Sequence, residues 1–323
     1  MLWEEGAFEL QTPLHTYIPA FKDTPVFKAG TAAAPVTEPQ LDPIRMWHVF
    51  SHTSGLSYGF LHANPVDAIY RNNGFEWGTP TGMDLEALCN KLAELPLAFQ
   101  PGREWNYSMS TDVLGRVVEV CSGMPLDDFF RTRIFEPLKM TDTAFWCPES
   151  KHDRLAALYA PLGPGRTAVR NDAMGNPAKQ RPDALSGGGG LVGTAHDYHR
   201  FLQMLSNGGE LDGVRLLSPT TITVMASNHL PGNVDLTAYG RQLFAETTFD
   251  GVGFGLAVSV TVNPVATKVP GSVGDYGWGG AASTWALVDP VEDLTVFFAT
   301  QLLPSSTWRI RSQLRPLVYQ ALV

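Results

Sequence analysis

Hydrophobic residues recur at helical spacing through the middle of the chain and at strand spacing through its last third. In the helical segments, apolar side chains fall three and four positions apart, which places them on one face. Asp84 and Thr194 stand where helix N-caps belong, and Gly208 follows the end of one helix. These patterns predict helices over residues 1–9 (a helix remnant), 44–50, 65–72, 84–95, 110–121, 126–135, 194–206, 218–227 and 307–322.

The final third of the chain changes period and predicts strands. β-rich runs broken by Gly, Pro and Asp cover residues 253–262, 284–289 and 294–300. Consecutive strands with short links form an antiparallel sheet, so the predicted fold class is α+β. Residues 22–42 are rich in Pro, Ala and Thr and predict an extended loop, whereas residues 140–184 predict loops with short strands.

We expect a single structural unit over residues 1–323. Residues from about 40 to 215 would form a mainly helical and loop region. Residues from about 216 to 323, together with the N-terminal remnant, would form the sheet and its flanking helices.

Composition narrows the classes of partner. The net charge of −9 disfavours nucleic acid and anionic membrane surfaces, and the sequence has no apolar run long enough to span a bilayer. Its three scattered cysteines predict free thiols in a reducing compartment. Because the first residues also lack a signal-peptide pattern, we expect a cytoplasmic protein. We also expect a monomer or a homodimer.

Residues 104–115 contain the first candidate for chemistry. A loop signal at residues 100–103 precedes Tyr107, and an amphipathic run follows, which Ser110 or Thr111 could cap. A phenol on a short turn before a helix can be held rigidly and aimed into a cleft. The alternative is a tyrosine that merely packs at a helix entrance.

Residues 274–288 contain the second candidate. This stretch opens in glycine and closes as a strand, with Gly279 and Gly280 following Trp278. Glycines at a strand edge let another backbone or a ligand approach closely.

Together the two stretches resemble the Tyr box and the third box of serine β-lactamases and penicillin-binding proteins. The resemblance is closest to family VIII carboxylesterases, in which Trp-Gly-Gly commonly stands in place of Lys-Thr-Gly. Residues 51–60 resemble the family's His-Thr-Ser-Gly-Leu segment, and residues 185–198 and 207–219 resemble other family stretches, in the family's order, up to about residue 304. The resemblance implies a β-lactamase/transpeptidase-like fold, with an antiparallel sheet flanked by helices beside a mainly helical region.

One family motif is absent. The family's nucleophile is the serine of Ser-x-x-Lys, and no serine of this chain has a lysine three positions later. Residues 1–10 resemble the end of the helix that carries this motif and the turn after it. We therefore expect an N-terminally incomplete family member that begins inside its catalytic helix.

The resemblance implies hydrolysis of a small-molecule carboxylic ester through a serine acyl-enzyme, without a cofactor or a metal. Tyr107 matches the family tyrosine and would transfer protons. The backbone N–H of Ala281 would donate to the oxyanion, while Trp278, Gly279 and Gly280 would shape the strand edge and the acyl pocket.

Two departures from the family pattern bear on the substrate. Met109 replaces a common asparagine, and Trp278 replaces a lysine that binds a substrate carboxylate. Both changes favour neutral short-chain or aromatic esters. The alternatives are a β-lactamase, a D-peptidase, an acyltransferase, or a catalytically inactive relative.

Other candidates are weaker. Ser54, near His52, lacks the G-x-S-x-G elbow and is better explained as a turn residue. The spacings of His48 with His52, and of His196 with His199, could suit a metal, but the first pair lacks the glutamate of H-E-x-x-H. The glycines at 187–190 lack the Lys of a phosphate loop and predict a tight turn. The basic side chains of Arg131, Arg133 and Lys139 predict a solvated helix face.

Overall fold

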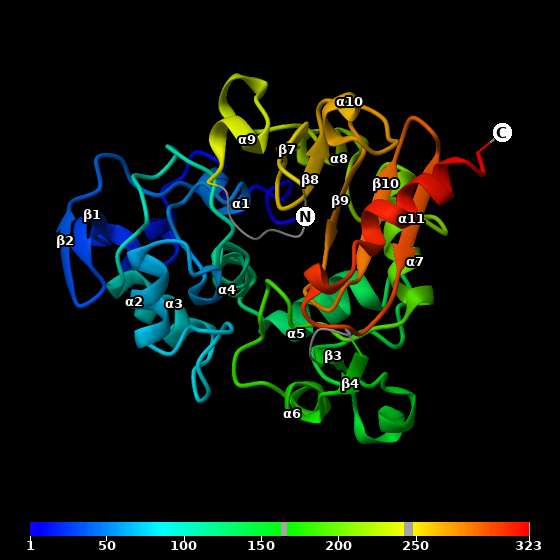
Figure 1. Ribbon diagram of the computed structural model, residues 1–323, viewed down its shortest axis with the longest axis horizontal. Coiled ribbons are helices and arrows are strands. Elements are labelled where there is room, and N and C mark those ends of the chain that lie inside the picture. The colour runs from blue at the N-terminus through cyan, green and yellow to red at the C-terminus, as the bar shows by residue number, and fades with distance from the viewer. Residues whose placement is uncertain (163–166, 242–247, 323) are drawn as a thin grey trace.

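An antiparallel sheet of five strands forms one side of the molecule, and helices from the first half of the chain form the other (Figure 1). The computed structural model describes residues 1–162, 167–241 and 248–322. The strand order is β11–β10–β9–β8–β7. The strands are β7 (Val252–Phe254), β8 (Ser259–Thr261), β9 (Tyr276–Gly279), β10 (Trp285–Asp289) and β11 (Leu294–Phe298).

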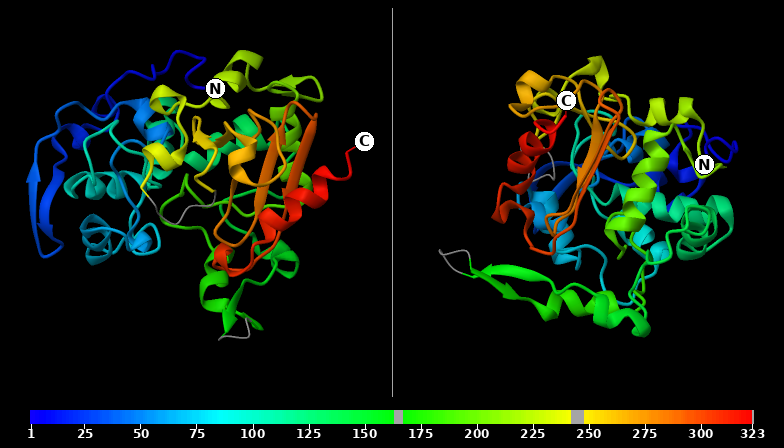
Figure 2. Two further views of the ribbon diagram at one scale, coloured as in Figure 1. Left: turned by 45° about the horizontal axis from the view of Figure 1, so that its top comes forward. Right: turned by 90° about the vertical axis from the view of Figure 1, so that its right-hand side faces the viewer.

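Helices cover both faces of this sheet (Figure 2). Helix α7 packs against β10 and β11, and α11 lies on the opposite face. The helices are α1 (Met46–Phe50), α2 (Pro65–Asn72), α3 (Leu85–Glu94), α4 (Ser110–Ser122), α5 (Leu126–Phe130), α6 (Asp172–Gly175), α7 (Ala195–Ser206), α8 (Pro219–Met225), α9 (Leu236–Tyr239), α10 (Pro264–Thr267) and α11 (Ile310–Tyr319). Within the described residues, none of the helices has the length and apolar character needed to cross a membrane.

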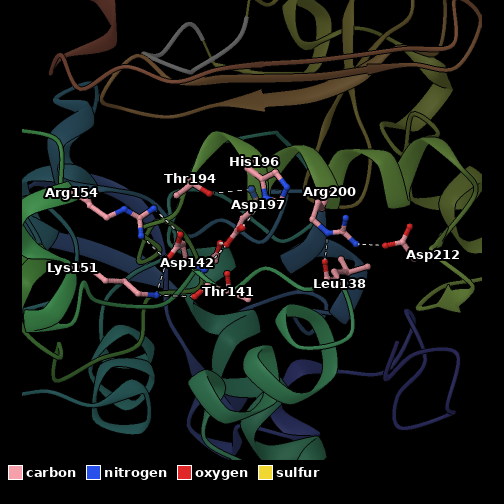
Figure 3. Close-up of polar contacts among 11 residues, drawn as sticks. Leu138, Thr141, Asp142, Lys151, Arg154, Thr194, His196, Asp197, Arg200 and Asp212 are labelled. Carbon is pink, nitrogen blue, oxygen red and sulfur yellow. Dashed lines mark hydrogen bonds and ion pairs between the residues drawn. The ribbon is translucent and has the colours of Figure 1, made fainter.

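The N-terminus of α7 shows how local chemistry fixes a helix in place. The Thr194 hydroxyl accepts from the Asp197 N–H at 3.1 Å, as the sequence predicts. The buried Asp197 carboxylate in turn accepts from the N–H of Asp142 at 2.7 Å and from Thr143 Oγ1 at 3.0 Å. Asp142 also pairs with Lys151 and Arg154 (Figure 3). This network links the N-terminus of α7 to residues 142–154.

Within the part of the chain that the structure describes, three hydrophobic clusters make up the core. The largest fills the helical half and includes Leu88, Leu92 and Val113. A second lies between the sheet and helices α7 and α8. The third is small and joins the two halves: Trp105, Leu230, Leu236, Val252 and Phe254.

Trp105 is the centre of the third cluster. Its side chain is 0% exposed and its ring lies 5.4 Å from that of Phe254, between centroids. Its backbone N–H donates to the carbonyl of Tyr239 at 2.9 Å, so the segment before α4 is bonded to the segment beside β7. Trp105 therefore fixes the position of this segment relative to the sheet.

The α+β fold class and most predicted helices are confirmed, with local differences. Residues 1–9 form hydrogen-bonded turns rather than a helix, because Gly6 at φ +75° reverses the chain. The predicted strand at residues 253–262 is divided into β7 and β8 by a turn at Ala257. The predicted helix at residues 126–135 continues beyond α5 as a π-helical turn over Arg131–Phe135.

The prediction of a loop over residues 22–42 is wrong. The structure has a hairpin of β1 (Val26–Thr31) and β2 (Ala34–Glu38). Because most of its side chains are exposed, the hairpin lacks the apolar alternation by which strands are recognised. The other short hairpins are β3 (Tyr159–Leu162) with β4 (Thr167–Arg170), and β5 (Glu210–Leu211) with β6 (Val214–Arg215).

We expect Trp105→Ala to lower the free energy of unfolding by about 3–5 kcal/mol, because it opens a cavity between the two halves. Urea denaturation of the variant and the wild type would measure this loss. Trp77→Ala is the matched control, since Trp77 is 70% exposed and its loss should cost about 0.5 kcal/mol or less. Equal unfolding midpoints for the two variants would show that Trp105 does not carry the contact between the halves.

Candidate active site

Tyr107 lies on the turn between Trp105 and helix α4, and its side chain is half-buried. Its neighbour Asn106 fixes this turn to the segment 52–57. The Asn106 N–H donates to the carbonyl of His52 at 2.9 Å, and Asn106 Nδ2 donates to the carbonyl of Leu56 at 3.0 Å. The phenol is therefore presented by a backbone with little freedom.

Three aromatic rings from distant parts of the chain surround the Tyr107 ring. The ring centroids of Tyr58, His52 and Trp278 lie 5.1, 5.2 and 5.4 Å from that of Tyr107. The contact with Trp278 brings together the two stretches that the sequence singled out. It places strand β9 of the sheet beside the turn that enters α4.

The glycines at the end of β9 leave room for the side chain of Arg311. Gly279 pairs with Trp285 of β10, and a Cβ at Gly279 would lie within 2.3 Å of the Arg311 guanidinium carbon. Arg311 Nη2 donates to the carbonyls of Gly280 at 2.7 Å and Thr284 at 2.8 Å. This side chain on α11 thus fixes the turn that follows β9.

Ala281 occupies the exposed tip of this turn. In the described part of the chain its N–H donates no hydrogen bond, whereas the neighbouring N–H groups of Gly280 and Ser283 bond to Thr284 and Gly280. A fixed N–H group without a partner can stabilise a developing negative charge.

A hydrogen-bonded group of buried side chains adjoins Tyr107. The Tyr58 hydroxyl shares hydrogen bonds with Tyr107 and with the Asp112 carboxylate. Asp112 also accepts from the Ser186 hydroxyl and from the N–H of Gly188, at 3.3 Å. Burial, with the added effect of Tyr107 and Asp112, raises the pKa of Tyr58 well above its usual value, and burial raises the pKa of Asp112. Tyr58 is therefore a neutral hydroxyl at neutral pH.

Sequence reasoning missed Tyr58, Asp112 and Arg311 as parts of this site. Tyr58 follows the His-Thr-Ser-Gly-Leu segment and Asp112 lies five residues after Tyr107, so both are inside stretches already singled out. The sequence contains no signal for Arg311, because its role depends on how α11 lies across the sheet.

The glycines at 187–190 form a turn, as predicted, and this turn closes over Asp112. A Cβ at Gly187 would lie 2.3 Å from the carbonyl oxygen of Thr111, and one at Gly188 would lie 2.9 Å from Asp112 Oδ2. Only glycines permit this close approach of the turn to the start of α4.

Ser54 and the first residue of α4, Ser110, belong to a hydrogen-bonded chain of buried hydroxyl groups that begins at His52. His52 Nδ1 is 3.0 Å from Ser108 Oγ, which is 2.8 Å from Ser110 Oγ, which is 2.9 Å from Ser54 Oγ. These serines are 0% exposed, so a substrate cannot reach them. The predicted capping role of Ser110 or Thr111 is wrong: Met109 is the N-cap, and the Ser110 hydroxyl joins this chain instead.

The remaining candidates lie as follows. Met109 is 0% exposed within the core of the helical half. His48 Nδ1 accepts from the N–H of Arg45 at 3.0 Å. Among the described residues no group of three His, Cys, Asp or Glu side chains could hold a metal.

The buried histidines should make stability depend on pH. Burial lowers the pKa of His52 to about 3, and burial together with Arg45 lowers that of His48 to about 4. The unfolded chain, with ordinary values near 6.5, therefore binds more protons as the pH falls below about 6.5. As the pH falls from 6.5 to 5, we expect each buried histidine to lower the free energy of unfolding by up to about 1.4 kcal/mol per pH unit.

Urea denaturation of wild type and His48→Gln at pH 7 and pH 5 tests this expectation, with the variant losing less stability on acidification. His196→Gln, at a side chain that is 76% exposed, is the control and should behave like the wild type. The same loss in all three proteins would contradict it. The comparison between variants is needed because buried carboxyl groups such as Asp112 have raised pKa values. Such groups raise the free energy of unfolding as the pH falls, which opposes the effect of the histidines.

Comparisons with known proteins agree with this architecture. The beta-lactamase family model matches residues 1–320. Protein Rv1367c of Mycobacterium tuberculosis is 34% identical over 94% of this chain and 73% of its own length. Esterase EstB of Burkholderia gladioli is 29% identical over 91% of this chain and 71% of its own. The structure of EstCE1, a hydrolase with promiscuous acyltransferase activity, is similar with a TM-score of 0.78 and 26% identity, over 98% of this chain and 80% of that one. The chain therefore belongs to the beta-lactamase family and has its β-lactamase/transpeptidase-like fold.

Proposed function

We propose that this site hydrolyses small-molecule carboxylic esters through a serine acyl-enzyme, as in family VIII carboxylesterases. The observation that carries the proposal is the contact between Tyr107 and Trp278, at 5.4 Å between ring centroids. It places a candidate proton-transfer group next to a strand edge that ends in a fixed N–H donor at Ala281. An acyl transfer needs both features within reach of the same carbonyl group.

Tyr107 transfers the proton in this proposal. It takes the proton from the serine hydroxyl during acylation and returns it to the leaving alcohol. A phenol has an ordinary pKa of about 10, so it acts as a base at neutral pH only beside a cation such as the lysine of Ser-x-x-Lys. The hydrogen bond with Tyr58 orients the hydroxyl group.

The nucleophile comes from sequence outside residues 1–323 in this proposal. No Ser-x-x-Lys occurs within these residues, and the serines nearest to Tyr107 are fully buried. Protein Rv1367c and EstB are both longer than the part that this chain matches, so each has further sequence in which such a motif could lie.

The side chains around Tyr107 favour neutral substrates. Trp278 stands where a lysine would bind a substrate carboxylate. Met109 is fully buried in the core of the helical half, so it is not one of the side chains that a substrate would meet. EstB is an esterase by name, which supports ester hydrolysis. EstCE1 is described as a hydrolase with promiscuous acyltransferase activity, which supports acyl transfer as the alternative outcome at the same acyl-enzyme.

We expect the 323-residue chain to hydrolyse p-nitrophenyl butyrate slowly or not at all, and a form extended upstream through a Ser-x-x-Lys helix to hydrolyse it rapidly. A serine-directed phosphonate should label only the extended form, as read by intact mass. If the short form is equally active and is labelled, a serine within residues 1–323 is the nucleophile and the assignment is wrong.

In the extended form, we expect Tyr107→Phe to lower kcat for p-nitrophenyl butyrate by about 10²- to 10⁴-fold, because the proton acceptor is lost. Thermal unfolding should change little, since the ring contacts remain. Tyr159→Phe is the control, at an exposed tyrosine of the β3–β4 hairpin, and should keep full activity. Retained activity in Tyr107→Phe would remove Tyr107 from the mechanism.

A further inference from the structure

A row of aromatic rings leads from Tyr107 to the surface. The Tyr58 ring lies next to Tyr107, and the Phe60 ring stacks on Tyr58 with centroids 4.8 Å apart and planes 24° apart. The Trp77 ring follows, 6.3 Å from Phe60 and 13° from parallel. The row passes from buried Tyr58, through half-buried Phe60, to Trp77 at 70% exposure.

The loop that carries Trp77 is fixed on both sides. Phe75, which is 0% exposed, packs into the core against Tyr70, with ring centroids 6.1 Å apart. On the other side, the N–H of Gly82 donates to Asp183 Oδ2 at 2.8 Å. These anchors hold the indole over Phe60, so its exposure is a feature of the fold rather than of a free chain end.

Single exposed apolar side chains are normal on protein surfaces and need no explanation. Trp77 differs because it ends a continuous stacked row whose inner end touches the candidate catalytic tyrosine. A flat ring laid against Trp77 and the exposed part of Phe60 would remove apolar surface from water and lengthen the row.

We propose that Phe60 and Trp77 bind the alcohol portion of the ester, and that this portion is a flat aromatic group. This inference rests on the proposed function, in which Tyr107 returns the proton to the leaving alcohol. The row starts at Tyr107 itself, so it adjoins the leaving-group side of the site, whereas Trp278 borders Tyr107 from the sheet. The aromatic alcohol would then be the part of the substrate that the protein recognises.

Binding of a ketone that mimics the ester tests this inference without requiring turnover. The probe is 1-(2-naphthyl)pentan-2-one, in which a CH₂ group replaces the ester oxygen, and pentan-2-one is its matched partner without the rings. Titration followed by NMR of the chain gives both dissociation constants. We expect Trp77→Ala to weaken binding of the naphthyl ketone about tenfold and to leave that of pentan-2-one unchanged.

Two further variants sharpen the test. Trp77→Phe retains a ring and should restore most of the binding. Tyr198→Ala removes another surface aromatic, stacked on Phe297 at 4.5 Å between centroids, and should leave both constants unchanged. A naphthyl ketone that binds wild type and Trp77→Ala equally, or fails to bind the wild type, would overturn the inference. So would an equal loss for both ketones, since it would indicate general damage to the site.

The proposed function and the aromatic subsite can be tested independently of each other. If the extended form hydrolyses p-nitrophenyl butyrate with dependence on Tyr107 while Trp77→Ala binds the naphthyl ketone normally, the esterase assignment stands and the aromatic subsite does not exist. If the naphthyl ketone depends on Trp77 but no ester is turned over, the row binds aromatic ligands and the esterase assignment is wrong.

Discussion

The packing of Trp105 between the helical half and the sheet is the contact on which the site depends. Its ring lies against Phe249 and Phe254, and its backbone is bonded to Tyr239. Tyr107 follows two residues later, so the position of the phenol relative to β9 is set by this buried contact. In the proposed mechanism Tyr107 transfers a proton, and such a group must be held to within a fraction of an ångström. In that mechanism the apolar contact between the halves serves the chemistry as well as the stability.

Burial also sets the charge states around Tyr107. His52 lies in edge contact with Tyr107, and burial keeps it neutral at physiological pH. Tyr58 stays protonated for the same reason, which leaves it able to share its hydroxyl with Tyr107 and Asp112. These side chains bring no positive charge to the phenol. In the proposed mechanism, the cation that lowers the pKa of the phenol is the lysine of the Ser-x-x-Lys helix.

Much of the fold could be predicted from the sequence, because apolar periodicity is strong in elements such as α3 (Leu85–Glu94) and α7 (Ala195–Ser206). Tyr107 and the glycines of β9 could be located because short motifs mark them. Tyr58, Asp112 and Arg311 could not be assigned, since their roles arise from contacts between segments that the sequence does not order in space. The hairpin of β1 and β2 was missed because its exposed side chains show no alternation.

The two sides of Tyr107 differ in a way that matters for specificity. On the sheet side, Arg311 fixes the turn after β9, and the glycines of this turn carry no side chains. The backbone N–H groups there are therefore held in one position, as the stabilisation of a developing oxyanion requires. On the other side, the stacked rings make no directional hydrogen bonds to a ligand, and stacking tolerates many flat shapes. If the two proposals hold, a site built in this way would constrain the reacting carbonyl strictly and the alcohol loosely. The enzyme would then select its esters by the presence of a ring rather than by its substituents.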